Sequence, residues 1–316
     1  MAGASTSVVL AALFANGAIA VLKFFGFLLT GSPSMLSETY HSISDTGNQV
    51  FLLFGIRYSG RTPSPSHPFG YGKAQFFYSF LVSVLLFGVA GWESLKHGYE
   101  ALTHGGHGGG GQPVEFLGIG PFDPIYVNVV VLLGAIAFET YAFKKADEEL
   151  RRQIAEYGWT GLVDAFRKTS DVTTLTAYTE DAIALGGATL ALVGILLSEF
   201  TGNEAYDAAA AVLIGLLLMG FAVALAWENK RLILGESLPR TVERDLRDVI
   251  DAHESVDHVD AFRTMFIGAN QVLVAAEVSF DSDLVTGDLD EDITEIKRKL
   301  READDRVRIV YVEPEI

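Results

Sequence analysis

Long apolar stretches divide most of the chain into segments that are each long enough to cross a lipid bilayer. A membrane-spanning helix needs about 20 mainly apolar residues, and the pattern reaches that length six times before residue 236. After this point the pattern becomes charged and amphipathic. The sequence therefore predicts an all-α bundle of six membrane spans, at residues 7–30, 34–57, 74–100, 123–143, 173–198 and 206–228.

The segment after residue 236 predicts a small α+β domain. Helical periodicity places Leu246, Val249 and Ile250 on one stripe, and Val272 and Val274 begin a strict alternation that is typical of a strand. An αββαβ order suggests helices on one face of a sheet. We expect two domains, 1–235 in the membrane and 236–316 outside it, the latter with helices at 239–252 and 288–302 and strands at 256–266, 271–280 and 307–311.

Composition supports a membrane protein and limits its chemistry. The mean hydropathy is +0.29 and the formal net charge is −17. Most of this charge lies after residue 236, where acidic residues outnumber basic ones about two to one. Such a surface repels nucleic acid and suits a cytoplasm of high salt, where ions screen the carboxylates, so we expect a halophilic source. Cysteine is absent, so any metal must be held by N and O ligands.

Lysine and arginine are concentrated in alternate connecting segments. By the positive-inside rule these segments face the cytoplasm, and the expected external segments 31–33, 101–122 and 199–205 contain neither residue, with Lys96 as the one counter-example. Both termini are therefore predicted to be cytoplasmic in a multi-pass protein of the cell membrane. The first stretch is read as a span and not as a signal peptide, because no basic segment precedes it. The orienting residues are Arg57, Arg61, Lys73, Lys144, Lys145, Arg151, Arg152, Arg167, Lys168, Lys230 and Arg231.

Span two carries ionisable residues inside its apolar stretch. At about 100° per residue, Glu38, His41 and Asp45 fall on one narrow stripe, which we expect to face the bundle interior. An ionisable residue at the bilayer centre costs roughly 2.5–3.5 kcal/mol on insertion scales, so such residues are typically functional. Imidazole and carboxylates are ligands of a borderline cation such as Zn²⁺. Hydrogen bonding to neighbouring helices is the alternative, but the pairing of His41 with Asp45 favours a metal.

Span five adds the adjacent carboxylates Glu180 and Asp181 at a similar depth. Neighbouring residues on a helix project about 100° apart, so both cannot point straight at one ion. The candidate metal ligands are therefore His41, Asp45 and Asp181, with Glu180 or a water as the fourth. Because metal binding requires deprotonated ligands, protons compete with the metal, and an imidazole titrates within physiological gradients. Proton-coupled exchange of a divalent cation is the predicted mechanism.

Other polar positions favour structural explanations. His67 lies in a Pro- and Gly-rich loop and is more readily an anchor than a ligand. His104 and His107 belong to a Gly-rich run that is foremost a linker. Lys23 either snorkels to the surface or pairs with an acid, and Asp207 could cap its own helix.

Several motifs together resemble the cation diffusion facilitator family. The pair His41-x3-Asp45 stands between two further motifs in the family's order and spacing, and the similarity extends from about residue 7 to Pro314. Within the family the chain looks closest to the zinc transporter nine branch. The residues that carry the resemblance are Leu22–Ser32, Met35–Asp45, His67–Lys73, Thr179–Ala182 and Thr201–Asn203.

The resemblance implies a homodimer of six-span protomers that exports a divalent metal from the cytoplasm in exchange for protons. It implies paired ligands at His41 and Asp45 and one at Asp181, which leaves Glu180 or a water as the fourth. Ala177 stands where many members place a ligand, so the metal selectivity is open. The tail is implied to be a cytoplasmic, metallochaperone-like domain. Most of the histidines of the family's tail site are missing, so no tail metal cluster is expected.

Transport of Zn²⁺ is the leading functional prediction, with protons, membrane lipid and a second copy of the chain as partners. N and O ligands also admit Mn²⁺, Fe²⁺ and Co²⁺. The chain could instead be a regulatory, non-transporting dimer partner of a metal transporter. An intramembrane metalloenzyme is disfavoured, because His41-x3-Asp45 lacks the paired-histidine signature of metalloproteases. We therefore expect no enzyme and no bound cofactor beyond the transported cation.

Overall fold

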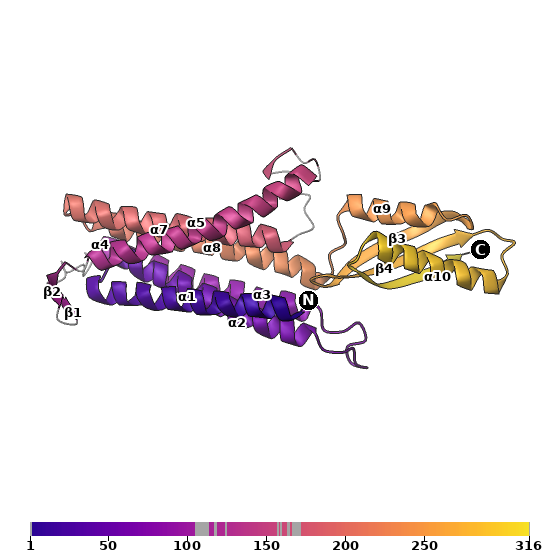
Figure 1. The fold of residues 1–316 in the computed structure, drawn as a ribbon, viewed down its shortest axis with the longest axis horizontal. Helices are drawn as coiled ribbons and strands as arrows, with labels where there is room; N and C mark the ends of the chain where they lie inside the picture. The colour runs from indigo at the N-terminus through magenta and orange to yellow at the C-terminus, as the bar shows by residue number, and fades with distance from the viewer. Residues whose placement is uncertain are drawn as a thin grey trace. The chain divides into compact units, whose positions relative to one another are not determined.

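The computed structural model describes residues 2–104, 114–116, 119–123, 125–156, 158, 160–162, 165 and 172–315. The helices and strands lie in the order shown in Figure 1. Their bounds are α1 Ala2–Thr30, α2 Pro33–Ser59, α3 Ala74–Leu85, the π-helical turn η1 Leu86–Gly91, α4 Trp92–His104, β1 Val114–Phe116, β2 Ile119–Phe122, α5 Ile125–Glu156, α7 Val172–Thr201, α8 Ala205–Leu234, α9 Arg240–Asp251, β3 Val256–Gly268, β4 Gln271–Phe280, α10 Thr286–Ala303 and β5 Val307–Glu315.

By their contacts the described residues form two compact units. The first comprises residues 1–53 and 79–227, and the second comprises residues 54–78 and 228–316. The loop between α2 and α3 therefore belongs with the tail in its packing. Gly72 shows this directly, because a Cβ there would lie 2.3 Å from the carbonyl oxygen of Ile267. The predicted boundary between a membrane domain, 1–235, and a domain outside the membrane, 236–316, stays a prediction.

The first unit is a helical bundle with the composition of a membrane protein. Among the described residues, five helical stretches are long and apolar enough to span a bilayer: Leu13–Thr30, Ala74–His104, Ile125–Glu156, Tyr178–Thr201 and Ala205–Leu234. The 27-residue α2 has the length of a span, about 40 Å at 1.5 Å per residue. Its polar stripe lowers its hydropathy, so the sixth span stays a prediction.

The helix α5 continues past the predicted end of its span at residue 143. Its last turns are charged and carry ion pairs between residues three or four apart, Arg151 with Asp147 at 2.7 Å and Arg152 with Glu149 at 2.6 Å. Pairs at this spacing lie on one helix face and support the helix outside an apolar environment. Hydropathy alone does not detect such an extension.

Small residues allow the helices of the bundle to approach closely. A Cβ at Gly98 of α4 would lie 2.7 Å from the backbone nitrogen of Val212 in α8, and one at Gly215 would lie 2.7 Å from that of Leu95. Close backbone contact at small residues is typical of membrane helix interfaces.

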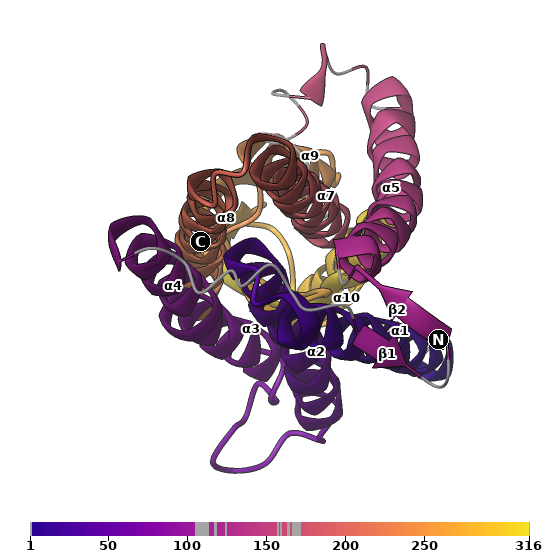
Figure 2. The ribbon, with the colours of Figure 1, turned by 90° about the vertical axis from the view of Figure 1, so that its left-hand side faces the viewer.

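Figure 2, along the bundle, shows α7 between α5 and α8. The buried core comprises Met35, Leu86, Ala90, Leu132, Ala188, Ala191, Ile195, Ile214, Leu218 and Ala222.

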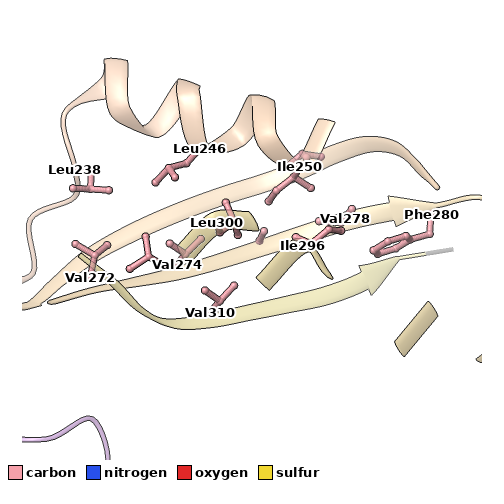
Figure 3. Close-up of a cluster of buried hydrophobic side chains, with 13 residues drawn as sticks. Leu238, Leu246, Ile250, Val272, Val274, Val278, Phe280, Ile296, Leu300 and Val310 are labelled. Carbon is pink, nitrogen blue, oxygen red and sulfur yellow. The ribbon is translucent and has the colours of Figure 1, made fainter. Parts of the chain in front are cut away.

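The tail has the predicted αββαβ order. The sheet runs β3-β4-β5, with β3 and β4 antiparallel and β4 and β5 parallel. Every second residue of β4 is buried, from Val272 to Phe280, as the alternation predicts. Figure 3 shows Leu246 and Ile250 of α9 and Ile296 of α10 directed toward the sheet. The core that joins these elements makes the tail a sheet with helices packed on its face.

Candidate metal site

The start of α2 is fixed by local capping and by a contact with α8. Gly31, with a φ of 66°, ends α1, and Ser32 begins α2 by accepting a hydrogen bond from the backbone N–H of Met35, 3.2 Å from its Oγ. Pro33 occupies the first helical position, where it has no N–H to satisfy. The N–H and hydroxyl of Ser34 both donate to Asp207 of α8. These contacts set the position of the residues that follow.

The predicted stripe on α2 faces the protein interior. Glu38 is 0% exposed and His41 is 2% exposed, and the side chain of Asp45 is 14% exposed. His41 Nε2 lies 3.6 Å from Asp45 Oδ2, and neither ring nitrogen of His41 makes a hydrogen bond to a described residue. Buried polar atoms are normally paired, so this imidazole, which has no hydrogen-bond partner among the described residues, is a candidate ligand for a cation.

The spacing of His41 and Asp45 fits two ligands of one ion. Ligand atoms about 2.0–2.1 Å from a tetrahedral Zn²⁺ are about 3.3 Å apart, and the observed separation is 3.6 Å. A small side-chain movement would bring both atoms into coordination distance. This pair is therefore the geometric centre of the candidate site.

The carboxylates of α7 lie within electrostatic range of this pair. Glu180 Oε1 accepts a hydrogen bond of 3.4 Å from Nδ2 of Asn48, which lies three residues after Asp45 on α2. The charges of Asp45, Glu180 and Asp181 act on one another. The α7 residues thus add acidic side chains close to the α2 stripe.

The structure adds Glu139 of α5, which the sequence reasoning missed. This partly buried carboxylate interacts electrostatically with Asp45, Lys23, His41 and Asp181. Its signal was available, because an isolated acid inside an apolar span is costly and therefore informative. A third helix of the bundle thus contributes an acidic side chain near the candidate site.

Lys23 of α1 pairs with an acid, which was one of the two predicted alternatives. Its Nζ lies 2.7 Å from Glu38 Oε2, and the two side chains are 2% and 0% exposed. The other oxygen, Oε1, has no hydrogen-bond partner among the described residues and faces Gly187 of α7. The ion pair joins α1 to the same stripe of α2 that carries His41.

The four predicted ligands do not form a closed cage. Within the described ranges, no group of three or more His, Asp or Glu side chains is close enough to hold a metal ion. Of the four side chains, His41 and Asp45 lie close together, with Nε2 3.6 Å from Oδ2. Ala177 lies in α7, but its side chain is outside those described. The full set of His41, Asp45, Asp181 and Glu180 therefore stays a prediction.

The remaining sequence candidates have structural contacts. His67 stacks on Tyr71 with ring centroids 4.3 Å apart, which fits an anchor of the loop. Asp207 binds Ser34 of α2, whereas Asn203 caps α8 by accepting from the N–H of Ala205 at 3.1 Å. His104 is exposed at the end of α4, and His107 lies outside the described residues.

Comparison with known proteins places the membrane unit in a family. A family model described as the cation efflux transmembrane domain matches residues 9–234. The mouse protein "Proton-coupled zinc antiporter SLC30A9, mitochondrial" is 32% identical over 280 residues, which are 88% of this chain and 47% of the relative. The chain thus spans about half the length of such curated relatives.

Two further relatives extend the similarity to plants and bacteria. "Metal tolerance protein C4" of Arabidopsis thaliana is 25% identical over 284 residues, 89% of this chain and 58% of the relative. "Cation-efflux pump FieF" of Klebsiella pneumoniae is 23% identical over 267 residues, 84% of this chain and 77% of the relative. Both similarities extend over more than four fifths of this chain.

Proposed function

Since the cation efflux domain matches most of its length, the chain belongs to the cation efflux, or cation diffusion facilitator, family, and we propose that it is a secondary transporter that exports Zn²⁺ from the cytoplasm in exchange for protons. The observation that carries this proposal is the buried His41, which has no hydrogen-bond partner among the described residues and lies 3.6 Å from Asp45. The relatives named for zinc antiport and cation efflux support the same class.

The cation binds between α2 and α7 in this proposal. His41 and Asp45 supply one nitrogen and one oxygen, Asp181 supplies a second oxygen, and Glu180 or a water completes the set. Three protein ligands with one exchangeable position suit a site that must release its ion, whereas a closed four-ligand cage suits a structural site. The hydrogen bond from Asn48 to Glu180 favours a supporting or proton-carrying role for that carboxylate.

Protons exchange with the cation because both need the same atoms. A bound metal requires the imidazole nitrogen and the carboxylate oxygens in deprotonated form, so metal binding releases protons. Protons that enter from the other side of the membrane displace the metal in turn. Buried carboxylates gathered around one imidazole need positive charge nearby, and either cargo supplies it.

The remaining organisation is proposed from the same family membership and from charge. The α2 helix forms the sixth span, both termini are cytoplasmic in the cell membrane, and the protomer pairs with a second copy. Residues 1–235 carry the transport path, and 236–316 form a metallochaperone-like tail.

The acidic tail fits a halophilic cytoplasm. The purified protein should therefore unfold at a lower temperature at low KCl than at molar KCl. Equal unfolding temperatures would exclude this adaptation.

Reconstitution of the chain alone tests transport. Proteoliposomes with a trapped pH dye should show proton flux when Zn²⁺ is added, and zinc movement without proton counterflow would reject the exchange. Asp45→Ala, Asp181→Ala and His41→Ala should each abolish zinc flux, whereas His104→Ala, which removes an exposed imidazole, should leave it unchanged. Wild-type flux in any of the first three variants would remove that residue from the site.

Competition in the same vesicles separates the alternatives. Mn²⁺, Fe²⁺ and Co²⁺ use the same ligand types, and the cation that competes best with zinc flux identifies the cargo. A regulatory dimer partner would show no flux when present alone. We propose a transporter and no enzyme. The buried His41–Asp45 pair and the relatives named for antiport and cation efflux support this class.

A further inference from the structure

The ion pair of Lys23 and Glu38 is not part of the proposed ligand set, yet it lies on the same stripe of α2. Glu38 precedes His41 by three residues, which places the two side chains about one turn apart on one face. Lys23 Nζ and Glu38 Oε2 are 2.7 Å apart and both side chains are buried. A buried pair of this kind gains little stability over apolar residues of similar volume. Its presence beside the candidate site therefore needs a second explanation.

Both members of the pair act electrostatically on the site, with opposite signs. Lys23 and Glu38 both interact electrostatically with His41 and with Asp45. A cation between His41 and Asp45 would therefore be repelled by Lys23 and attracted by Glu38. The balance between these two charges sets part of the binding free energy of the cation.

The second oxygen of Glu38 affects how the charges of Lys23 and Glu38 together act on a bound cation. Oε1 has no hydrogen-bond partner among the described residues, although the other oxygen is held by Lys23 at 2.7 Å. Gly187 leaves it room, because a Cβ at that position would lie 2.6 Å from Oε1. The carboxylate would be free to strengthen cation binding if Lys23 did not hold and neutralise it.

We propose that Lys23 and Glu38 are a positioning pair that limits the cation affinity of the His41–Asp45 site, so that the bound cation can leave. Lys23 neutralises a carboxylate that would otherwise deepen the site. Transport requires binding that is favourable enough for entry and weak enough for release. This inference rests on the proposed function, because it requires a cation at His41 and Asp45.

Three variants of the full-length protein test the pair. Lys23→Met leaves Glu38 free and should tighten zinc binding by about tenfold or more, since a unit charge within about 10 Å acts strongly on a divalent ion. Glu38→Gln leaves Lys23 uncompensated and should weaken binding by a similar factor. The double variant carries neither charge and should return to within about threefold of wild type. Calorimetric titration with Zn²⁺ in detergent gives the dissociation constants.

The transport kinetics supply a readout that a purely structural pair would not move. Lys23→Met should lower both KM and kcat for zinc flux in proteoliposomes, because a tighter site releases its ion more slowly. Lys96→Met is the matched control, since it makes the same change at a lysine that is 48% exposed and pairs with Glu93 of its own helix. Its zinc affinity should equal that of wild type.

The outcomes are distinguishable. Shifts of the dissociation constant in the same direction for Lys23→Met and Glu38→Gln, or no shift in either, would overturn the inference while leaving the transporter intact. If Lys23→Met does not fold, the comparison of Glu38→Gln with the double variant measures the effect of the Lys23 charge alone, and equal affinities there would overturn it as well. If wild-type protein binds no Zn²⁺, Mn²⁺ or Co²⁺, the proposed function itself fails.

Discussion

A single methyl group at Gly187 should disturb the candidate site, whereas the same group at the neighbouring Gly186 should not. A Cβ at 187 would lie 2.6 Å from Glu38 Oε1, which is closer than real Cβ atoms approach other atoms. Its distance to Glu38 Cδ would be 3.7 Å, an ordinary contact. Apart from the backbone of its own helix, no atom of a described residue lies within 4 Å of a Cβ at 186. Both glycines are in α7, so the pair isolates the contact between α7 and α2 from the general effect of alanine.

The expected magnitude follows from two opposing terms. Replacing a helical glycine by alanine gains up to about 1 kcal/mol at either position. At 187 the added methyl group overpacks the interface, which typically costs about 1–3 kcal/mol. Glu38 cannot turn aside easily, because its other oxygen is held by Lys23 at 2.7 Å. Gly187→Ala should therefore be less stable than Gly186→Ala by about 1–3 kcal/mol.

Unfolding in mixed micelles and zinc titration measure the two consequences. Gly186→Ala should unfold at or above the wild-type midpoint and bind zinc as wild type does. Gly187→Ala should unfold earlier and bind zinc about tenfold more weakly, the equivalent of about 1.4 kcal/mol, because the strain separates the carboxylates of α7 from α2. Identical unfolding and identical affinity in the two variants would refute the packing of α7 against Glu38.

Three further changes test other parts of the chain. Ala177→His should tighten zinc binding by at least about tenfold, because a fourth ligand completes a tetrahedral set, and an unchanged calorimetric affinity would show that this face of α7 points elsewhere. Gly72→Ala should destabilise the protein by about 1–3 kcal/mol, since its Cβ would lie 2.3 Å from the carbonyl oxygen of Ile267, and a wild-type melting temperature would contradict that contact. A hydrogen bond with Asp257 and the charges of neighbouring carboxylates raise the pKa of His258, so its stabilisation is complete below the pKa of the unfolded imidazole, about 6.5, and is lost as the pH rises through the folded value. His258→Asn should therefore reduce the fall in melting temperature between about pH 6 and pH 8, and an unaltered pH profile would exclude this contribution.

The fold was predictable where one physical signal dominates. Apolar length located the helices α1, α5, α7 and α8, and strict alternation located β4 at its observed bounds, Gln271–Phe280. The end of α5 was missed because ion pairs such as Arg151 with Asp147 extend a helix without any apolar signal. The grouping of the loop after α2 with the tail was also missed, because it depends on close contacts of Gly72 that no local pattern encodes.

The candidate site was predictable only along one helix. Helical periodicity placed Glu38, His41 and Asp45 on one stripe, and their burial agrees with that placement. Helical periodicity does not predict contacts between helices, and the partner of Lys23 lies 15 residues away on another helix. Glu139 is a single acid within an apolar run, and only the packing of α5 reveals that it acts on Asp45.

In the proposed transporter, the positions of the charged side chains explain why α2 should determine most of the metal specificity. The α2 stripe supplies the imidazole and the nearest carboxylate, at 3.6 Å, while α5 and α7 supply carboxylates that interact with it through space. Carboxylates buried together repel one another unless positive charge lies among them. Lys23 lies 2.7 Å from Glu38 and also acts electrostatically on Asp45, and in the proposed transporter the bound cation adds further positive charge beside Asp45. In the proposed transporter such a site would favour cations in general, and the nitrogen of His41 would favour Zn²⁺ over harder ions such as Mg²⁺.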